Sequence, residues 1–184
     1  MKFPTLTPQV RLLGTVDDDM VTNFLSQFEQ ACSGPDPIVI ELMTTGGGAE
    51  SARRIGVEVA HAREHLHKEI FFYGKTVVYS AGVTIMASFP QPYRYLSRDT
   101  TLMIHERKLE KRVRLPGPTT ANIQVVRELL AQLEAGRKLE QRCWAQLGEG
   151  SRMEAGEIAR YAMNSWYFSA DEALQRGLVA DLVR

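Results

Sequence analysis

Short apolar runs alternate along the chain with longer stretches in which apolar residues recur every three or four positions. The run Ile-Val-Ile-Glu-Leu at 38–42 is typical of a parallel strand buried on both faces. The stretch behind Asp17, a favourable helix N-cap, has the period of an amphipathic helix. This alternation predicts the order βαβαβαβ, an α/β fold with right-handed crossovers around one sheet. We expect strands at residues 10–13, 38–42, 70–73, 101–104 and 178–183, and helices at residues 17–31, 50–67, 80–88 and 119–147 and after the capping box at residues 169–172.

One predicted helix is too long for a compact domain of this size. From Thr119 to about Leu147 only Gly136 interrupts the helical pattern. At 1.5 Å per residue such a helix is roughly 40 Å long, so part of it must protrude from a single domain that spans residues 1–184. Its apolar stripe then needs a partner, and we expect a homo-oligomer formed through this helix.

Two polar residues stand where catalytic chemistry would need them. Ser80 opens an apolar helical run and His105 ends a strand-like one. A serine hydroxyl needs a neighbouring imidazole to take its proton, and the acyl-transfer intermediate needs N–H donors for its oxyanion. The amide of Ala81 at the helix N-terminus can be one donor, and Gly46–Gly48, directly after a buried strand, can supply another. Each feature alone is more often an N-cap, a strand-end histidine or a turn, but their conjunction indicates a nucleophile and a base.

The same segments resemble the proteolytic subunit of the Clp protease family (ClpP), within the wider crotonase-like superfamily. The resemblance implies a ClpP/crotonase-like repeated ββα/βαβ spiral with a protruding handle helix that interlocks two subunit rings. It also implies a serine peptidase acting on peptides or unfolded proteins. In that resemblance Ser80 is the nucleophile, His105 the general base, and Gly47 with Ala81 the oxyanion hole. The segments that carry it are residues 10–17, 42–48, 79–82, 102–105, 167–174 and 177–179.

The chain departs from the family pattern in several places. Ser165 stands where the family has the aspartate that orients the histidine. Without a carboxylate the imidazole loses the partner that stabilises its charged form, although Ser165 or Asn164 could still accept the Nδ1 hydrogen bond. The basic segment 108–114 replaces a glycine-rich strand that holds substrate in the family. The chain also begins almost at its first strand, so the segment that helps family members engage a Clp-type ATPase is nearly absent, and that partner stays uncertain.

The amino-acid composition limits the classes of partner that we expect. Twenty-two basic and twenty-two acidic residues leave no net charge, so we expect neither a nucleic-acid nor a membrane partner. Cys32 and Cys143 form no disulfide framework or zinc motif, and the N-terminal residues do not have the pattern of a secretory signal. We therefore expect a cytoplasmic protein. His61 and His65, four residues apart on a predicted helix, lack a third ligand nearby, so no metal and no cofactor are predicted.

Three hypotheses from different classes remain. The first is a ClpP-like serine peptidase working through a Ser80–His105 acyl-enzyme. The second is a weak or inactive ClpP-like structural subunit, which the missing carboxylate favours. The third is a crotonase-like acyl-CoA enzyme, which would use two backbone amides for an enolate and a carboxylate base instead of a serine; the match at Ser80 and His105 argues against it.

Overall fold

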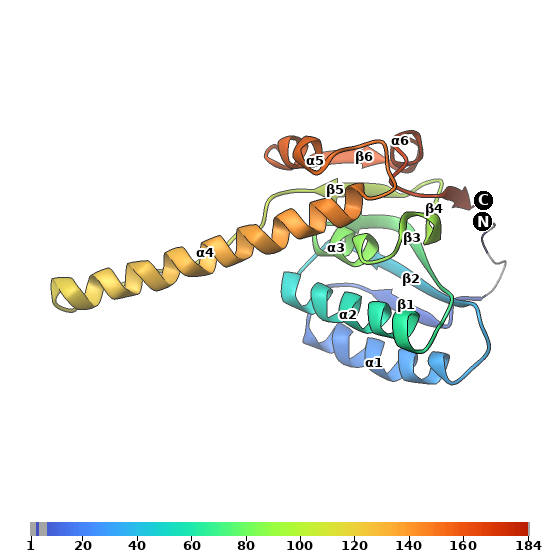
Figure 1. The fold of residues 1–184 in the computed structure, drawn as a ribbon, viewed down its shortest axis with the longest axis horizontal. Helices are drawn as coiled ribbons and strands as arrows, with labels where there is room; N and C mark the ends of the chain where they lie inside the picture. Colours follow the sequence, from blue (N-terminus) through green and yellow to red (C-terminus); the bar gives the residue numbers. More distant parts are fainter. Residues whose placement is uncertain (1–2, 4–6, 184) are drawn as a thin grey trace.

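A mixed sheet forms the centre of the molecule in a computed structural model, which describes residue 3 and residues 7–183 (Figure 1). The sheet is built from β1 (Val10–Leu13), β2 (Ile38–Thr44), β3 (Ile70–Tyr79), β4 (Arg94–Ser97), β5 (Thr101–Ile104), β6 (Trp166–Ser169) and β7 (Asp181–Val183). The helices are α1 (Asp18–Cys32), α2 (Ala49–His65), α3 (Ala81–Ala87), α4 (Thr119–Gly148), α5 (Ala155–Ala162) and α6 (Ala170–Gln175), with a 3-10 turn η1 (Gln91–Tyr93). The strand order is β1-β2-β3-β4-β7, with β5 between β3 and β6.

The two faces of β2 enter two separate apolar clusters. Ile38, Ile40 and Leu42 face the main core, which also holds residues of α1, α2 and α3. Val39 faces the other way, into a smaller aromatic cluster with Phe71 and Tyr95. This alternation explains why four of the five residues at 38–42 are apolar, as expected for a strand covered on both sides; the exception, Glu41, pairs with Lys75. The predicted strand is therefore confirmed.

Strand β3 is longer than the sequence indicated, because it serves two branches of the sheet. Its first part pairs in parallel with β4, from Phe72 to Gly74, and its last part pairs in parallel with β5, from Val77 to Tyr79. The two branches separate around Thr76, a non-glycine residue with a positive φ of 58°. Strand β6 then pairs antiparallel with β5. As a result, the C-terminal ends of β3 and β5 lie next to each other.

Several predicted boundaries were wrong for identifiable reasons. The helix expected to reach residue 67 ends at His65, because His67 has a left-handed φ of 53°. The strand expected at 178–183 is limited to Asp181–Val183. Strand β4 was missed because a charged residue, Arg94, lies fully buried within it. The capping box is confirmed, since the Ser169 Oγ accepts the Glu172 N–H at 3.2 Å.

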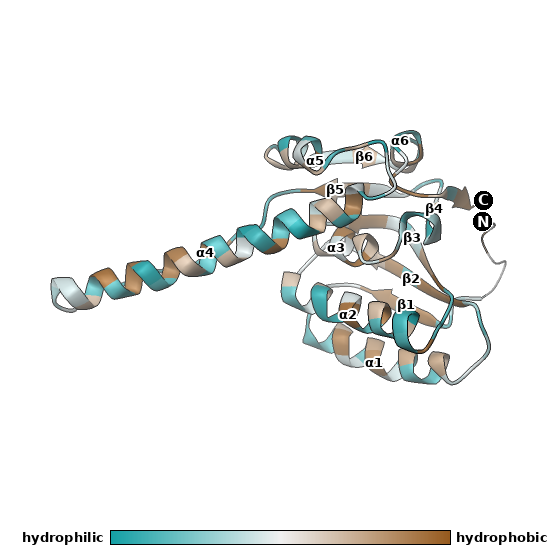
Figure 2. Ribbon diagram, in the orientation of Figure 1, coloured by the Kyte–Doolittle hydropathy of each residue, from teal (hydrophilic) through white to brown (hydrophobic). Residues whose placement is uncertain are grey.

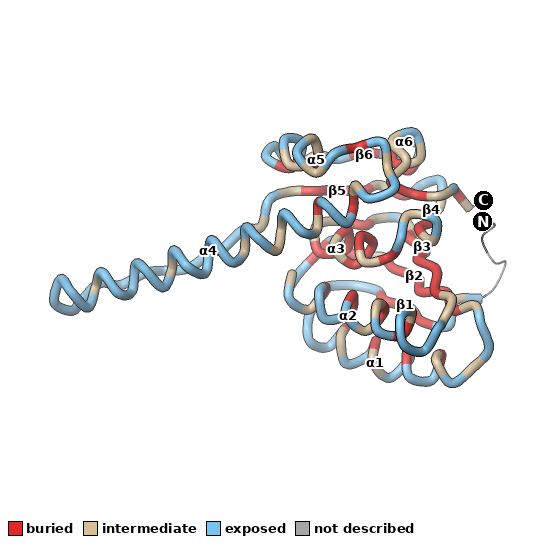
Figure 3. Tube along the Cα trace, in the orientation of Figure 1, coloured by how far each residue is buried: buried red, intermediate tan, exposed pale blue. Residues whose placement is uncertain are grey.

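Helix α4 extends far beyond the rest of the molecule (Figure 1) and is exposed along most of its length (Figure 3). Only Trp144 and Leu147, near its C-terminal end, are buried. Apolar residues recur along the exposed part (Figure 2); Leu130 keeps 54% and Leu133 49% of its surface exposed. The described residues of the chain therefore leave this apolar stripe uncovered.

Arg94 fixes the base of α4 to the body. Its guanidinium donates to the carbonyls of Gln146 at 2.7 Å and Leu147 at 2.9 Å, and its Nε donates to Phe89 at 2.7 Å. Further acceptors are the carbonyls of Ala87 and Leu178. Burial lowers the pKa of Arg94 to about 10. The five carbonyls replace the water that a buried cation loses.

No helix among the described residues has both the length and the hydropathy needed to cross a bilayer.

Candidate active site

Ser80 occupies a strained turn between β3 and α3. Its φ of 52° and ψ of −112° place a non-glycine residue in a sparsely populated backbone region, and strain of this kind concentrates at functional sites. The Ser80 N–H is held by the carbonyl of Met103 at 2.8 Å. The strand-turn-helix geometry puts the serine at the start of a buried helix, the position at which α/β-hydrolases carry their nucleophilic serine.

A glycine turn after β2 lies directly against this serine. A Cβ on Gly46 would lie 2.9 Å from the Cβ of Ser80, and one on Gly47 would lie 2.3 Å from the carbonyl oxygen of Val16. Both positions also have positive φ, 112° and 148°. Only glycine satisfies both the space and the backbone here. The turn therefore brings bare backbone up to the candidate nucleophile.

The hydrogen bonds of the turn leave one amide available. Val16 donates its N–H to Gly46 at 3.0 Å and accepts the Gly48 N–H at 2.6 Å. This parallel bridge uses the groups on either side of Gly47, so the N–H of Gly47 itself points away from Val16. Ala81 is the first residue of α3, and its amide has no acceptor within the helix. The two predicted oxyanion donors are thus both free of backbone partners in this geometry.

One cavity of about 780 Å³ brings the predicted residues together. Gly47, Ser80, Ala81 and His105 all line it, together with parts of α2 and the base of α4. The cavity lining comes from four segments of the chain, within residues 45–60, 80–88, 104–108 and 139–147. Their convergence on one hollow is the arrangement that acyl transfer requires.

His105, directly after β5, is in the tautomer of a general base. Its Nδ1 lies 2.5 Å from the carbonyl oxygen of Glu106. Because a carbonyl oxygen only accepts, this contact assigns a proton to Nδ1, and in the neutral imidazole Nε2 then keeps its lone pair. Within residues 7–183 no direct hydrogen bond joins His105 to Ser80; catalytic hydrogen bonds often tighten only when substrate is bound.

Ser165 lies beside His105 but outside the cavity lining. The β5–β6 pairing ends with Ile104 opposite Trp166, so the next position on each strand is His105 and Ser165. Ser165 is exposed, has a φ of 53°, and donates its N–H to Ala162 at 3.1 Å. Because the carbonyl of Glu106 already accepts from Nδ1, a role of Ser165 or Asn164 as third catalytic group stays a prediction.

Charged groups that the sequence did not connect with the site lie at the cavity. The Arg107 N–H donates to the Glu140 Oε1 at 2.5 Å, and the Arg107 guanidinium donates to Glu50 at 2.7 Å. The hydrogen bond from Arg107 holds the pKa of Glu50 below its ordinary value, whereas burial raises the pKa of Glu140. These residues are 33 and 57 positions from Arg107, and no local pattern in the sequence links them.

Four further reactive side chains are those of Lys75, His61, His65 and Cys143. Lys75 pairs with Glu41 at 2.8 Å, so it is engaged away from Ser80. The rings of His61 and His65 lie 4.7 Å apart, but the described residues contain no group of three potential metal ligands. Burial raises the pKa of Cys143, which lines the cavity and keeps the thiol form.

The fold and the cavity together define an α/β protein with a ClpP-like spiral and a protruding helix. No protein-family model matches the chain, and no curated protein matches it in sequence. Among solved structures, the fold is similar to that of a mutant of ClpP1 from Listeria monocytogenes, with a TM-score of 0.75 and 19% sequence identity. The similarity covers 95% of this chain and 90% of that one. The fold expected from the sequence is confirmed.

Proposed function

We propose that the protein is a serine peptidase that hydrolyses peptide bonds through an acyl-enzyme. One observation carries the proposal: Ser80, at a strained helix N-terminus, shares a cavity with His105 and with two backbone N–H donors. The tautomer of His105 supports it further, because Nε2 is left as the proton acceptor.

In this mechanism the Ser80 Oγ attacks the carbonyl carbon of the scissile bond while its proton passes to Nε2 of His105. The amides of Gly47 and Ala81 donate to the oxyanion of the tetrahedral intermediate. When the intermediate collapses, the C–N bond breaks and His105 returns the proton to the leaving amine. Water then attacks the ester with the same base, releasing the acid and restoring the serine.

We also propose that the substrate is a peptide or unfolded protein and that the protein works as a homo-oligomer. The cavity of about 780 Å³ is large enough for several side chains of an extended segment. A second copy of this chain would cover the apolar stripe of α4, which includes Leu130 and Leu133.

The decisive experiment is labelling with a fluorophosphonate probe, followed by mass mapping of the modified residue. We expect the wild-type protein to be labelled at Ser80, and Ser80→Ala to lose both labelling and peptide cleavage. Ser26→Ala, which changes an exposed serine on α1, is the matched control and should behave as wild type. Equal labelling of wild type and Ser80→Ala would overturn the peptidase assignment.

A second candidate function is that of a weak or inactive structural subunit. The observation favouring it is that Ser165, not a carboxylate, occupies the position beside His105. In that case the wild-type protein would assemble through α4 and yet remain unlabelled by the probe at every pH tested.

A further inference from the structure

A carboxylate lies close to His105, on an element that the sequence did not link to catalysis. Glu140 is in the base of α4, is half-buried, and lines the same cavity as Ser80 and His105. Its Oε1 accepts the N–H of Arg107 at 2.5 Å, two residues beyond His105. The carboxylate therefore holds the segment that carries the imidazole.

The charge of Glu140 is not cancelled by a directly paired cation. Its other oxygen makes no hydrogen bond or ion pair with any described residue. The nearby guanidinium of Arg107 is directed to Glu50 instead, at 2.7 Å, and Glu50 also binds Arg53 at 2.5 Å. The negative charge of Glu140 thus remains available to the cavity.

The surroundings of this carboxylate decide how it titrates. Burial is the largest influence and raises the pKa of Glu140; the Arg107 N–H opposes it, and the charge of His105 is near enough to lower it as well. The charged or titratable groups around Glu140 and His105 are Glu106, Arg107 and Lys108 after β5, Glu50 and Arg53 on α2, and Arg142 and Cys143 on α4.

We propose that Glu140 is the positioning residue of this site and performs from α4 the two tasks of the carboxylate that is absent at Ser165. It fixes the segment from His105 to Arg107 through the Arg107 N–H, and its charge stabilises the protonated imidazole. The inference rests on the proposed peptidase function, because it concerns the base of that reaction.

The proton balance of the step is simple. During acylation the proton of Ser80 Oγ moves to Nε2 of His105, and the imidazole becomes positively charged. The other ring proton stays on Nδ1 throughout, donated to the carbonyl oxygen of Glu106. Glu140 accepts no proton; its negative charge lowers the energy of the charged imidazole in the transition state.

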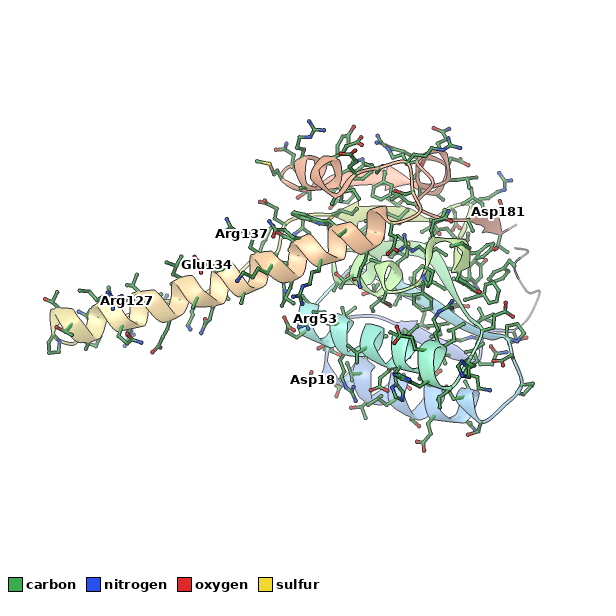
Figure 4. The ribbon with its side chains drawn as sticks, in the orientation of Figure 1. Asp18, Arg53, Arg127, Glu134, Arg137 and Asp181 are labelled. Carbon is green, nitrogen blue, oxygen red and sulfur yellow. The ribbon has the colours of Figure 1, made fainter. Side chains whose placement is uncertain are left out.

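Three variants separate the two tasks. Glu140→Gln keeps an oxygen acceptor for the Arg107 N–H but removes the charge, and Glu140→Ala removes both. Glu134→Gln is the control, since Glu134 is an exposed carboxylate on the protruding part of the same helix (Figure 4). The measurements are the rate of Ser80 labelling by a fluorophosphonate as a function of pH, and hydrogen–deuterium exchange of the Arg107 amide.

We expect Glu140→Gln to be labelled about tenfold more slowly than wild type at neutral pH, equivalent to about 1.4 kcal/mol, with unchanged exchange at Arg107. Because the pKa of Glu140 is raised, its charge is lost early as the pH falls, so the difference between wild type and Glu140→Gln should vanish in acid. Glu140→Ala should be slower still and should also exchange faster at Arg107. Glu134→Gln should match wild type.

Several results would overturn the inference. Labelling of Glu140→Gln at the wild-type rate would show that the charge does not act on His105. A rate difference that persists unchanged in acid would indicate a packing effect instead. An unchanged rate of hydrogen–deuterium exchange at the Arg107 amide in Glu140→Ala would show that Glu140 does not fix the segment after His105. A wild-type protein that is never labelled would overturn the peptidase function itself, and the positioning role with it.

Discussion

The backbone N–H of Ser80 donates to the carbonyl of Met103 at 2.8 Å, two residues before His105. This bond continues the parallel pairing of β3 with β5, in which Tyr79 stands opposite Met103. The candidate nucleophile and the candidate base therefore come directly after two strands that pair with each other. Their spacing depends on backbone hydrogen bonds, so changes to the turn around Ser80 should affect the site directly.

Gly46→Ala should disrupt that turn. The new Cβ would lie 2.9 Å from the Cβ of Ser80, at a φ of 112° that alanine rarely adopts. We expect a loss of about 2 kcal/mol in the free energy of unfolding, measured by urea denaturation, together with much slower probe labelling of Ser80.

Gly136→Ala is the matched control for this substitution. A Cβ on Gly136 would meet nothing within 4 Å among the described residues, and alanine favours a helix interior by about 1 kcal/mol over glycine. This variant should be slightly more stable than wild type. If Gly46→Ala were as stable as wild type and were labelled at the wild-type rate, the glycine turn would not lie as close to Ser80 as described.

Arg94→Met should destabilise the attachment of α4. It removes the donor for five carbonyls, among them those of Gln146 and Leu147, and leaves them buried without a partner. We expect a loss of about 3 kcal/mol or more in the free energy of unfolding. Arg98→Met, an exposed arginine in the loop after β4, should cost little. Similar thermal midpoints for both variants would contradict the anchoring role.

Replacing Leu130 and Leu133 together with glutamate should reduce the size of the assembly seen by light scattering. The two side chains form part of the exposed apolar stripe of α4, and charges there would have to be desolvated in an interface. Ala135→Glu adds a charge at another exposed position of the same helix and should leave the assembly intact. A wild-type protein that is already monomeric would refute the expected interface.

Ser165→Asp should raise peptidase turnover about tenfold. The position follows the last β5–β6 pair and lies next to His105, and aspartate tolerates the φ of 53° better than most residues. The same change should restore labelling to Glu140→Gln, because it brings a new carboxylate to the imidazole in place of the one removed. An unchanged rate in a folded Ser165→Asp protein would mean that His105 keeps its bond to Glu106 alone.

Much of the fold could be predicted because its signals are local. The apolar run at 38–42 and the N-cap at Asp17 each specify their element with neighbouring residues only; the Asp17 side chain does accept the Met20 N–H at 2.9 Å. Strand β4 was hidden because Arg94 is buried by carbonyls from distant segments, which no local pattern reveals. Where the stabilising partner is remote in sequence, hydropathy gives the wrong expectation.

The residues of the candidate site also differ in whether a local sequence pattern identifies them. Ser80 and Gly47 could be predicted because helix starts and glycine turns have recognisable residues, and the structure brings both to one cavity with His105. Glu140 could not be found this way. It belongs to a helix whose periodic pattern indicated only an interface, and its contact with Arg107 depends on how the base of that helix meets the end of β5.

The carbonyls around Arg94 also bear on the order in which the chain can fold. Those of Ala87 and Phe89 are available early in synthesis, whereas those of Gln146, Leu147 and Leu178 are made much later. A nascent chain that ends before α4 is complete would have to leave this cation hydrated and the sheet around it open. Arg94 therefore ties the body to the C-terminal third of the chain, so we expect the two to unfold in one cooperative transition.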